Sequence, residues 1–316
     1  MDVHVLIQLL EVIDAIGIMI ALSKQSQILR QGWRKEPKSQ RAKESDAMQH
    51  FCLRQADLSH VDLVNHWFQY GFKLTHSDLY RSNLSYAHLF QLDLSYSSLM
   101  KADLRHANLH SANLEQANLL GVKLDNAKLE GVKWGEKVWQ EILGDQSQNI
   151  SEQRRLYSEA EVIYRNIGRV LRFNGLTEEA GVFFYREMVM RRKQFPRFST
   201  KRILFRLIDA YCGYGEKPLR LIFFSIVKIV FFAMLYVFVG IQHDGNIQAV
   251  TLVTPLSDAV SHFFDALYFS LVTFTTLGYG DYSPAGLSRF IASIEALVGS
   301  FTIALFVVVF VRHFNR

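Results

Sequence analysis

The residues with the clearest capacity for chemistry are the backbone groups of Thr275-Thr276-Leu277-Gly278-Tyr279-Gly280-Asp281. Glycine tolerates a positive φ, so two glycines around one tyrosine let the chain extend with successive carbonyl oxygens on one side. A row of carbonyl oxygens can take the place of the water around a cation. Residues 263–274, just before this stretch, are apolar and helical in period but too few to cross a bilayer. We expect a re-entrant helix there, whose carbonyl end favours a cation.

The stretch TLGYGD resembles the TVGYGD selectivity filter of potassium channels, with Leu277 in place of valine. The resemblance implies that K⁺ is bound by the backbone carbonyls of Thr276, Leu277, Gly278 and Tyr279 and by the Thr276 hydroxyl, with Asp281 at the outer mouth. It also implies a homotetramer, because each chain has one such loop and four loops form a pore. We therefore expect passive conduction of potassium ions, with no cofactor and no enzymatic activity.

Two apolar segments, residues 221–241 and 287–311, flank the loop, and each is long enough to span a bilayer. Nine Lys or Arg residues lie between 191 and 220, and none lies between Ile241 and Ser288. The positive-inside rule then predicts cytoplasmic termini and an outward-facing loop, in contact with membrane lipids. Lys228 is expected to extend back toward the cytoplasmic surface. By resemblance, the location is a cell membrane, specifically a prokaryotic inner membrane.

Two residues of the second span invite a functional interpretation. Gly299 lies where related channels place a bending glycine, but a small residue for close helix packing is an equal alternative. Glu295 precedes it by one turn, about 12 Å inside the outer end of the helix, where a bare carboxylate is costly. We expect Glu295 to be partly or wholly protonated and to hydrogen bond to Ser270 and Thr273. It either only locks two helices together or couples helix bending to the loop.

A leucine recurs every five residues between residues 51 and 134, with a small or apolar residue two positions earlier and a one-residue slip at Gly71-Phe72. This A-(D/N)-L-x-x pattern closely resembles pentapeptide-repeat proteins. The resemblance implies a right-handed, four-sided β-helix, in which sixteen repeats from Leu53 to Leu129 make four coils. Residues twenty apart would then stack. Tyr80, Met100 and Leu120 would form an outward apolar ladder that contacts a neighbouring subunit or the N-terminal helix.

The charge of the repeat segment argues against a nucleic-acid partner. Residues 51–134 hold eight Lys or Arg and eight Asp or Glu, so the segment neither mimics a polyanion nor binds one. Seven of the eleven histidines lie in residues 50–110, scattered and without cysteine partners, which argues against a metal site. The binding partner of this segment is not identified by the sequence.

The complete chain is predicted to be a multidomain protein. Its parts are an amphipathic N-terminal helix (1–22), a polar linker (23–50), a cytoplasmic β-helix (51–134), an α-helical neck (135–218) and an all-α two-span pore domain (219–316). The N-terminal helix docks on a surface or, alternatively, spans the membrane. The neck contains two helices within 151–194, joined at Asn174-Gly175, and the second Gly-Tyr-Gly, at 213–215, is a turn. We expect no sensing domain after the last span, so a gating stimulus would act through the N-terminal part, voltage, lipid or pH.

Two other functions fit the same features. The first is an interaction scaffold, anchored by two helices around a silent pore. The second is a cation channel of poor selectivity. Flux of potassium and sodium through reconstituted vesicles separates these alternatives from a potassium channel.

Overall fold

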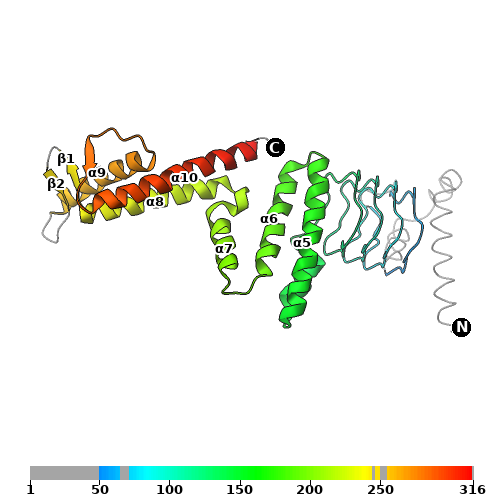
Figure 1. Ribbon diagram of the computed structural model, residues 1–316. Coiled ribbons are helices and arrows are strands. Elements are labelled where there is room, and N and C mark those ends of the chain that lie inside the picture. The colour runs from blue at the N-terminus through cyan, green and yellow to red at the C-terminus, as the bar shows by residue number, and fades with distance from the viewer. Residues whose placement is uncertain (1–49, 65–70, 244–245, 250–254, 315–316) are drawn as a thin grey trace, which may run out of the picture. The chain divides into compact units, whose positions relative to one another are not determined.

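The computed structural model describes residues 50–64, 71–243, 246–249 and 255–314 (Figure 1). The chain divides into two compact units, Met1–Ser199 and Thr200–Arg316, which are treated separately below. The predicted N-terminal helix over 1–22 and nearly all of the linker over 23–50 lie outside the described residues.

The first unit contains a parallel β-coil, drawn in blue to cyan in Figure 1. Parallel bridges join residues twenty apart, from Lys73↔Asp93 to Asn113↔Lys133. The central leucines point inward, and Leu74, Leu89 and Leu104 are completely buried. The predicted coil of four five-residue repeats is therefore confirmed. Its interior is a column of leucines and alanines whose burial favours the stack.

The corner of each repeat is a residue in the left-handed region, two positions after the central leucine. Tyr86 and Tyr96 have φ values of 59° and 60° there, although such a conformation is uncommon outside glycine. The rings at these corners stack between coils. His60, Tyr86 and His106 form one column, with ring centroids 5.0 and 4.6 Å apart. The histidines predicted to be scattered are thus partly ordered, because several share this corner position.

The first described coil is longer than the others. Its bridges join Cys52↔Asp78 and Asp57↔Asn83, an offset of 26, whereas later bridges have an offset of 20. The difference, 26 − 20 = 6, shows that six residues are inserted, so the predicted one-residue slip is wrong. An insertion of six residues equals one five-residue repeat plus one residue. It therefore shifts the spacing of the leucines by one, just as a one-residue slip would. Gly71 ends the insertion, where an added Cβ would lie 1.9 Å from the Gln91 carbonyl oxygen.

Three helices follow the coil in the described part of the first unit: α4 (Trp139–Gln146), α5 (Ile150–Phe173) and α6 (Thr177–Lys193). The predicted hairpin at Asn174-Gly175 is confirmed, with Gly175 at φ 80°. Side chains of the hairpin cover the last coil, whose carbonyls have no further coil to pair with. Asn166 Nδ2 donates to the Val122 carbonyl at 2.9 Å, and Asn174 Nδ2 donates to the Ala127 carbonyl at 2.6 Å. The hairpin therefore caps one end of the coil.

The second unit begins with α7 (Thr200–Cys212), a helix that we did not predict, and the 3₁₀ turn η2 (Gly213–Gly215). Two long helices follow, α8 (Pro218–Val239) and α10 (Ser288–Phe314). By length and composition alone, α8 and residues Ser288–Val311 of α10 can cross a membrane. Between them lies α9 (Leu256–Phe274), which starts at Leu256 rather than at the predicted residue 263.

The expectation of an all-α pore domain is wrong in one detail. Three short strands, β1 (Ile241–His243), β2 (Asn246–Gln248) and β3 (Tyr282–Pro284), form an antiparallel sheet in the order β2-β1-β3. The sheet pairs the chain after α8 with the chain after the 275–281 loop, through Ile241↔Pro284. Strands of three residues give almost no periodicity, which is why the sequence did not reveal them.

Candidate functional site

The loop from Thr275 to Asp281 has the alternating backbone that the sequence predicted. Gly278 and Gly280 have φ values of 59° and 85°, and a Cβ added at either would meet nothing within 4 Å. Backbone conformation, rather than space, is therefore what requires glycine at these two positions. Thr276 has φ 58° as well, a left-handed threonine that glycine spacing could not reveal. Leu277 and Tyr279, between them, are not in the positive-φ region, so the sign of φ alternates from Thr276 to Gly280.

The loop starts directly on the carbonyl end of α9. Thr275 N–H donates to Leu271 O at 3.0 Å, and Leu277 N–H donates to Val272 O at 3.0 Å. The Thr275 hydroxyl also donates to Leu271 O, at 2.7 Å. These bonds fix the first loop residues to the last turn of α9. A shift of α9 would therefore move the loop with it.

The end of the loop is anchored by aromatic side chains. The Tyr268 hydroxyl of α9 donates to the Asp281 carboxylate, and His243 Nδ1 lies 3.1 Å from the Asp281 carbonyl oxygen. The His243 ring stacks on Tyr282, with centroids 4.4 Å apart. Desolvation acts to raise the pKa of Asp281, but the bond from Tyr268 and backbone hydrogen bonds outweigh it and keep that pKa below its usual value. Asp281 is therefore ionised at neutral pH and attracts cations.

The loop is open on one side in the single chain. Leu277 and Tyr279 are 61% and 69% exposed, and the α10 side chains Phe290 and Phe301 are 67% and 70% exposed. Lipid can cover an apolar helix, but it cannot pair with the backbone polar groups of an irregular loop. A single chain thus forms one wall of a site rather than an enclosed site.

Glu295 lies behind the loop, fully buried where three helices meet. Its Oε1 is 2.5 Å from Ser270 Oγ of α9, and its Oε2 accepts from the Tyr236 hydroxyl of α8 at 2.6 Å. Ser270 is confirmed as a partner, while Tyr236 takes the place predicted for Thr273. Tyr236 is 59 positions away in the chain, so no local pattern could identify it.

Gly299 packs against the end of α9. An added Cβ would lie 2.1 Å from the Phe274 carbonyl oxygen and 2.9 Å from its carbonyl carbon. The helix α10 runs without interruption from Ser288 to Phe314. Of the two interpretations of Gly299, this geometry favours close helix packing over a bend.

Lys228 joins three helices of the second unit. Its Nζ donates to the Tyr211 hydroxyl of α7 at 2.5 Å and to Thr302 Oγ1 of α10 at 2.8 Å. The predicted extension toward the start of α8 fits the contact with Tyr211, whose ring lies 5.9 Å from that of Phe224, one turn nearer that end. The ammonium ends on hydroxyl groups, and its contact with the Tyr211 ring at 4.5 Å adds to this.

The apolar ladder of the first unit is only half-buried. Tyr80, Met100 and Leu120 occupy equivalent positions in successive coils, as the bridges Asp78↔Ser98 and Ser98↔Asn118 require. The Arg54 guanidinium covers part of the Tyr80 ring, 5.0 Å from its centroid. Leu120 packs against the core. Met100 is thus the member of the ladder that is most available to a partner.

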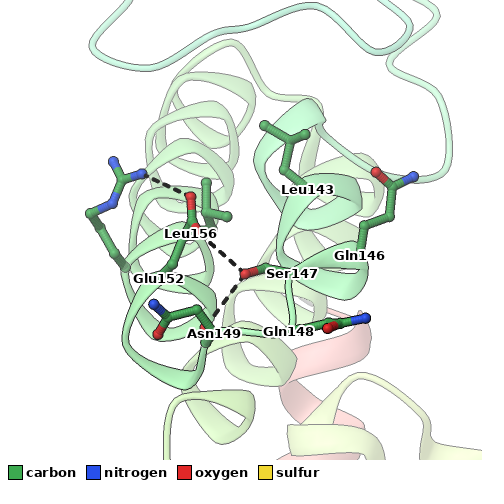
Figure 2. A pocket seen from close by; sticks show the side chains of 8 residues that line it. Leu143, Gln146, Ser147, Gln148, Asn149, Glu152 and Leu156 are labelled. Carbon is green, nitrogen blue, oxygen red and sulfur yellow. Dashed lines mark hydrogen bonds and ion pairs between the residues drawn. The ribbon is translucent and has the colours of Figure 1, made fainter.

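A pocket of 490 Å³ lies at the junction of α4 and α5 (Figure 2). Figure 2 shows Ser147 directed toward Asn149 and Glu152, which are both exposed, and Asn149 caps the start of α5 by accepting from the Ser151 N–H. Its polar groups serve the helix cap, so the pocket does not resemble a ligand site. No group of three or more His, Cys, Asp or Glu residues suited to a metal ion occurs in the part of the chain that the structure describes.

Comparison with known families identifies both parts of the chain. Residues 221–316 match the family model described as ion channel. Residues 97–133 match pentapeptide repeats, in eight copies. The chain joins an ion-channel segment to pentapeptide repeats. The family matched by residues 221–316 is one of channels, not of enzymes. In addition, α8 and α10 are long and apolar enough to cross a membrane.

The individual relatives cover only parts of the chain. Protein LctB of Bacillus caldotenax is 44% identical over 71 residues, which make up 22% of this chain and 50% of LctB. The crystal structure of HetL, a pentapeptide repeat protein of Nostoc sp. strain PCC 7120 involved in regulating heterocyst differentiation, is 33% identical. It covers 27% of this chain and 46% of HetL, with a TM-score of 0.14. Rfr23, a pentapeptide repeat protein of Cyanothece 51142, is 25% identical over 28% of this chain and 84% of its own, with a TM-score of 0.15.

Proposed function

We propose that this chain forms a homotetrameric potassium channel, in which carbonyls of Thr276, Leu277, Gly278 and Tyr279 replace the water around K⁺. The observation that carries the proposal is the alternation of φ along TLGYGD, at the carbonyl end of α9 and within the segment that matches ion channels. The ionised Asp281 supports cation rather than anion passage, because its negative charge lies at one end of the loop.

The open side of the loop supports a tetramer. One loop supplies one wall, and a ring of loops would cover Leu277 and Tyr279 while surrounding the ion with carbonyls. In this arrangement α9 is a re-entrant pore helix, α8 is the outer helix and α10 the inner helix. The charge asymmetry of the sequence supports an outward-facing loop and cytoplasmic repeats.

Ion flux tests the proposal against its two alternatives. The full chain is reconstituted into lipid vesicles loaded with potassium or sodium, and efflux is followed with an ion-selective electrode. A potassium channel releases potassium and retains sodium. A poorly selective cation channel releases both, and an anchored repeat scaffold releases neither.

The topology has a test of its own, because the first unit contains an exposed thiol. Cys52 is exposed and Cys212 is buried, so Cys52 is the thiol open to a reagent in water. In intact cells, a membrane-impermeant maleimide should leave Cys52 unmodified, and it should react once the membrane is opened. Modification of intact cells would contradict a cytoplasmic first unit. The variant Cys52→Ser identifies any labelling of Cys212.

The repeat unit gives the channel a surface for assembly or regulation. We propose that the ladder of Tyr80, Met100 and Leu120 contacts a neighbouring copy, since Met100 is apolar and only half-buried in one chain. A change in that contact would reach the pore through the helices that follow the coil.

A further inference from the structure

Glu295, Ser270 and Tyr236 form a polar cluster inside the ion-channel segment, and none of the three is accessible to solvent. The cluster joins α10, α9 and α8. Buried polar groups require hydrogen-bond partners, so each proton in the cluster can be assigned to a bond.

The serine hydroxyl has two oxygen neighbours and one proton. Ser270 Oγ lies 2.9 Å from the Ile229 carbonyl oxygen of α8 and 2.5 Å from Glu295 Oε1. One hydroxyl proton cannot serve both oxygens fully, and the carbonyl can only accept, whereas a neutral carboxyl group can also donate. Both contacts are therefore satisfied when the serine donates to Ile229 and Glu295 donates to the serine. Tyr236 donates its proton to the other carboxyl oxygen.

An ionised Glu295 fits the same neighbours less well. The serine proton would have to turn to the carboxylate, which leaves two oxygens, Ser270 Oγ and Ile229 O, in contact without a proton between them. No salt bridge to Glu295 occurs among the described residues, and Lys228 of α8 is bound to Tyr211 and Thr302 instead. A buried charge without a cationic partner is costly in a membrane protein.

We propose that Glu295 is held as a neutral carboxylic acid and acts as a positioning residue for the loop. The hydrogen-bond chain from Glu295 through Ser270 to Ile229 fixes α9 between α10 and α8. Ser270 lies five residues before Thr275, where the loop begins. These hydrogen bonds therefore fix the part of α9 from which the loop extends. One turn further along both helices, Gly299 of α10 packs against Phe274 of α9, so the two helices meet again beyond Glu295 and Ser270. The effect on selectivity rests on the function proposed above, whereas the protonation state does not.

Infrared spectroscopy tests the protonation state directly. The full chain is assembled in lipid vesicles at neutral pH, and the spectrum of Glu295→Gln is subtracted from that of the original protein. Glutamine keeps the shape, donates to Ser270 and accepts from Tyr236. The difference spectrum should contain the carbonyl band of a protonated carboxylic acid. If only a carboxylate band disappears in the variant, Glu295 is ionised and the proposal is overturned.

Variants of the cluster test its positioning role. Glu295→Gln should keep the potassium-to-sodium permeability ratio, and this ratio should not change from mildly acidic to mildly alkaline pH. Ser270→Ala removes the central hydroxyl of the hydrogen-bond chain with little change in side-chain volume. It should lower the potassium-to-sodium permeability ratio even where tetramers assemble normally. Ser293→Ala removes an exposed hydroxyl of α10, the helix that carries Glu295, and serves as the control.

The outcomes separate the two proposals. Loss of selectivity in Ser270→Ala but not in Ser293→Ala supports positioning, and an unchanged ratio in Ser270→Ala overturns it. If the original protein does not conduct at all, the proposed function fails. The infrared band then still decides whether Glu295 is neutral.

Discussion

Replacing Gly299 by alanine should push α10 away from α9. The new Cβ would lie 2.1 Å from the Phe274 carbonyl oxygen, whereas ordinary van der Waals contact begins at 3.4 Å. The difference, 3.4 − 2.1 = 1.3 Å, is the separation that the two helices must gain at this contact. The obstacle is backbone rather than the tip of a flexible side chain, so a rotamer change cannot relieve it.

The free-energy cost of overpacking in Gly299→Ala should exceed the gain in helix propensity from replacing glycine by alanine. Overpacking of this kind costs about 1–3 kcal/mol per chain. Alanine is better than glycine in a helix by about 1 kcal/mol, which offsets only part of that cost. The movement is also transmitted to the loop, because Thr275 is bonded to the last turn of α9. We therefore expect a less stable assembly and a lower potassium-to-sodium permeability ratio.

Thermal dissociation of the tetramer in mild detergent measures the first effect, and flux from vesicles measures the second. Ser293→Ala, an exposed position of the same helix, is the matched control for helix propensity. If Gly299 acted as a hinge, alanine would stiffen the helix, leave the assembly as stable or more stable, and change only opening. A Gly299→Ala protein with unchanged melting and unchanged selectivity would refute the packing argument.

Three further predictions concern the first unit. Burial alone would raise the pKa of Asp145, but hydrogen bonds from Lys137, Lys193 and Tyr157 lower it to about 2. Asp145→Asn should therefore cost about 1 kcal/mol at neutral pH, after a reduction for solvent screening. Chemical unfolding should show that this difference disappears as pH falls from about 4 to about 2, and a constant difference would contradict it. Asn174→Ala removes the bond to the Ala127 carbonyl and should cost about 1 kcal/mol in the same assay, unlike a change at exposed Arg172. Met100→Lys should weaken tetramer assembly on size-exclusion chromatography, whereas His110→Lys, at the equivalent position of another face, should not.

The sequence predicted those features that are local along the chain. The five-residue spacing of leucines sufficed for the coil, because each repeat places its own leucine inside. The glycines at 278 and 280 indicated the alternating loop for the same reason. The sequence did not predict the helix α7, because Lys201, Arg202 and Arg206 interrupt its apolar residues and give the segment the composition of a basic linker.

Features that depend on contacts distant in sequence could not be predicted in the same way. Tyr236 meets Glu295, and Phe274 meets Gly299, only because three helices pack together. The six-residue insertion in the first coil is visible only in the bridges between coils, such as those of Cys52 with Asp78 and of Asp57 with Asn83. The left-handed Thr276 follows from the loop geometry, since threonine itself disfavours that conformation.

The most direct test of the central claim is the reversal potential of the full chain in a planar bilayer, with potassium on one side and sodium on the other. A potassium filter predicts a reversal potential close to the potassium equilibrium potential. Gly278→Ala should abolish this selectivity, because alanine is strained at φ 59°. Gly286→Ala, at φ 54° and also without neighbours within 4 Å, should not. A reversal potential near zero for the original protein, or selectivity that survives in Gly278→Ala, would contradict the assignment of the filter.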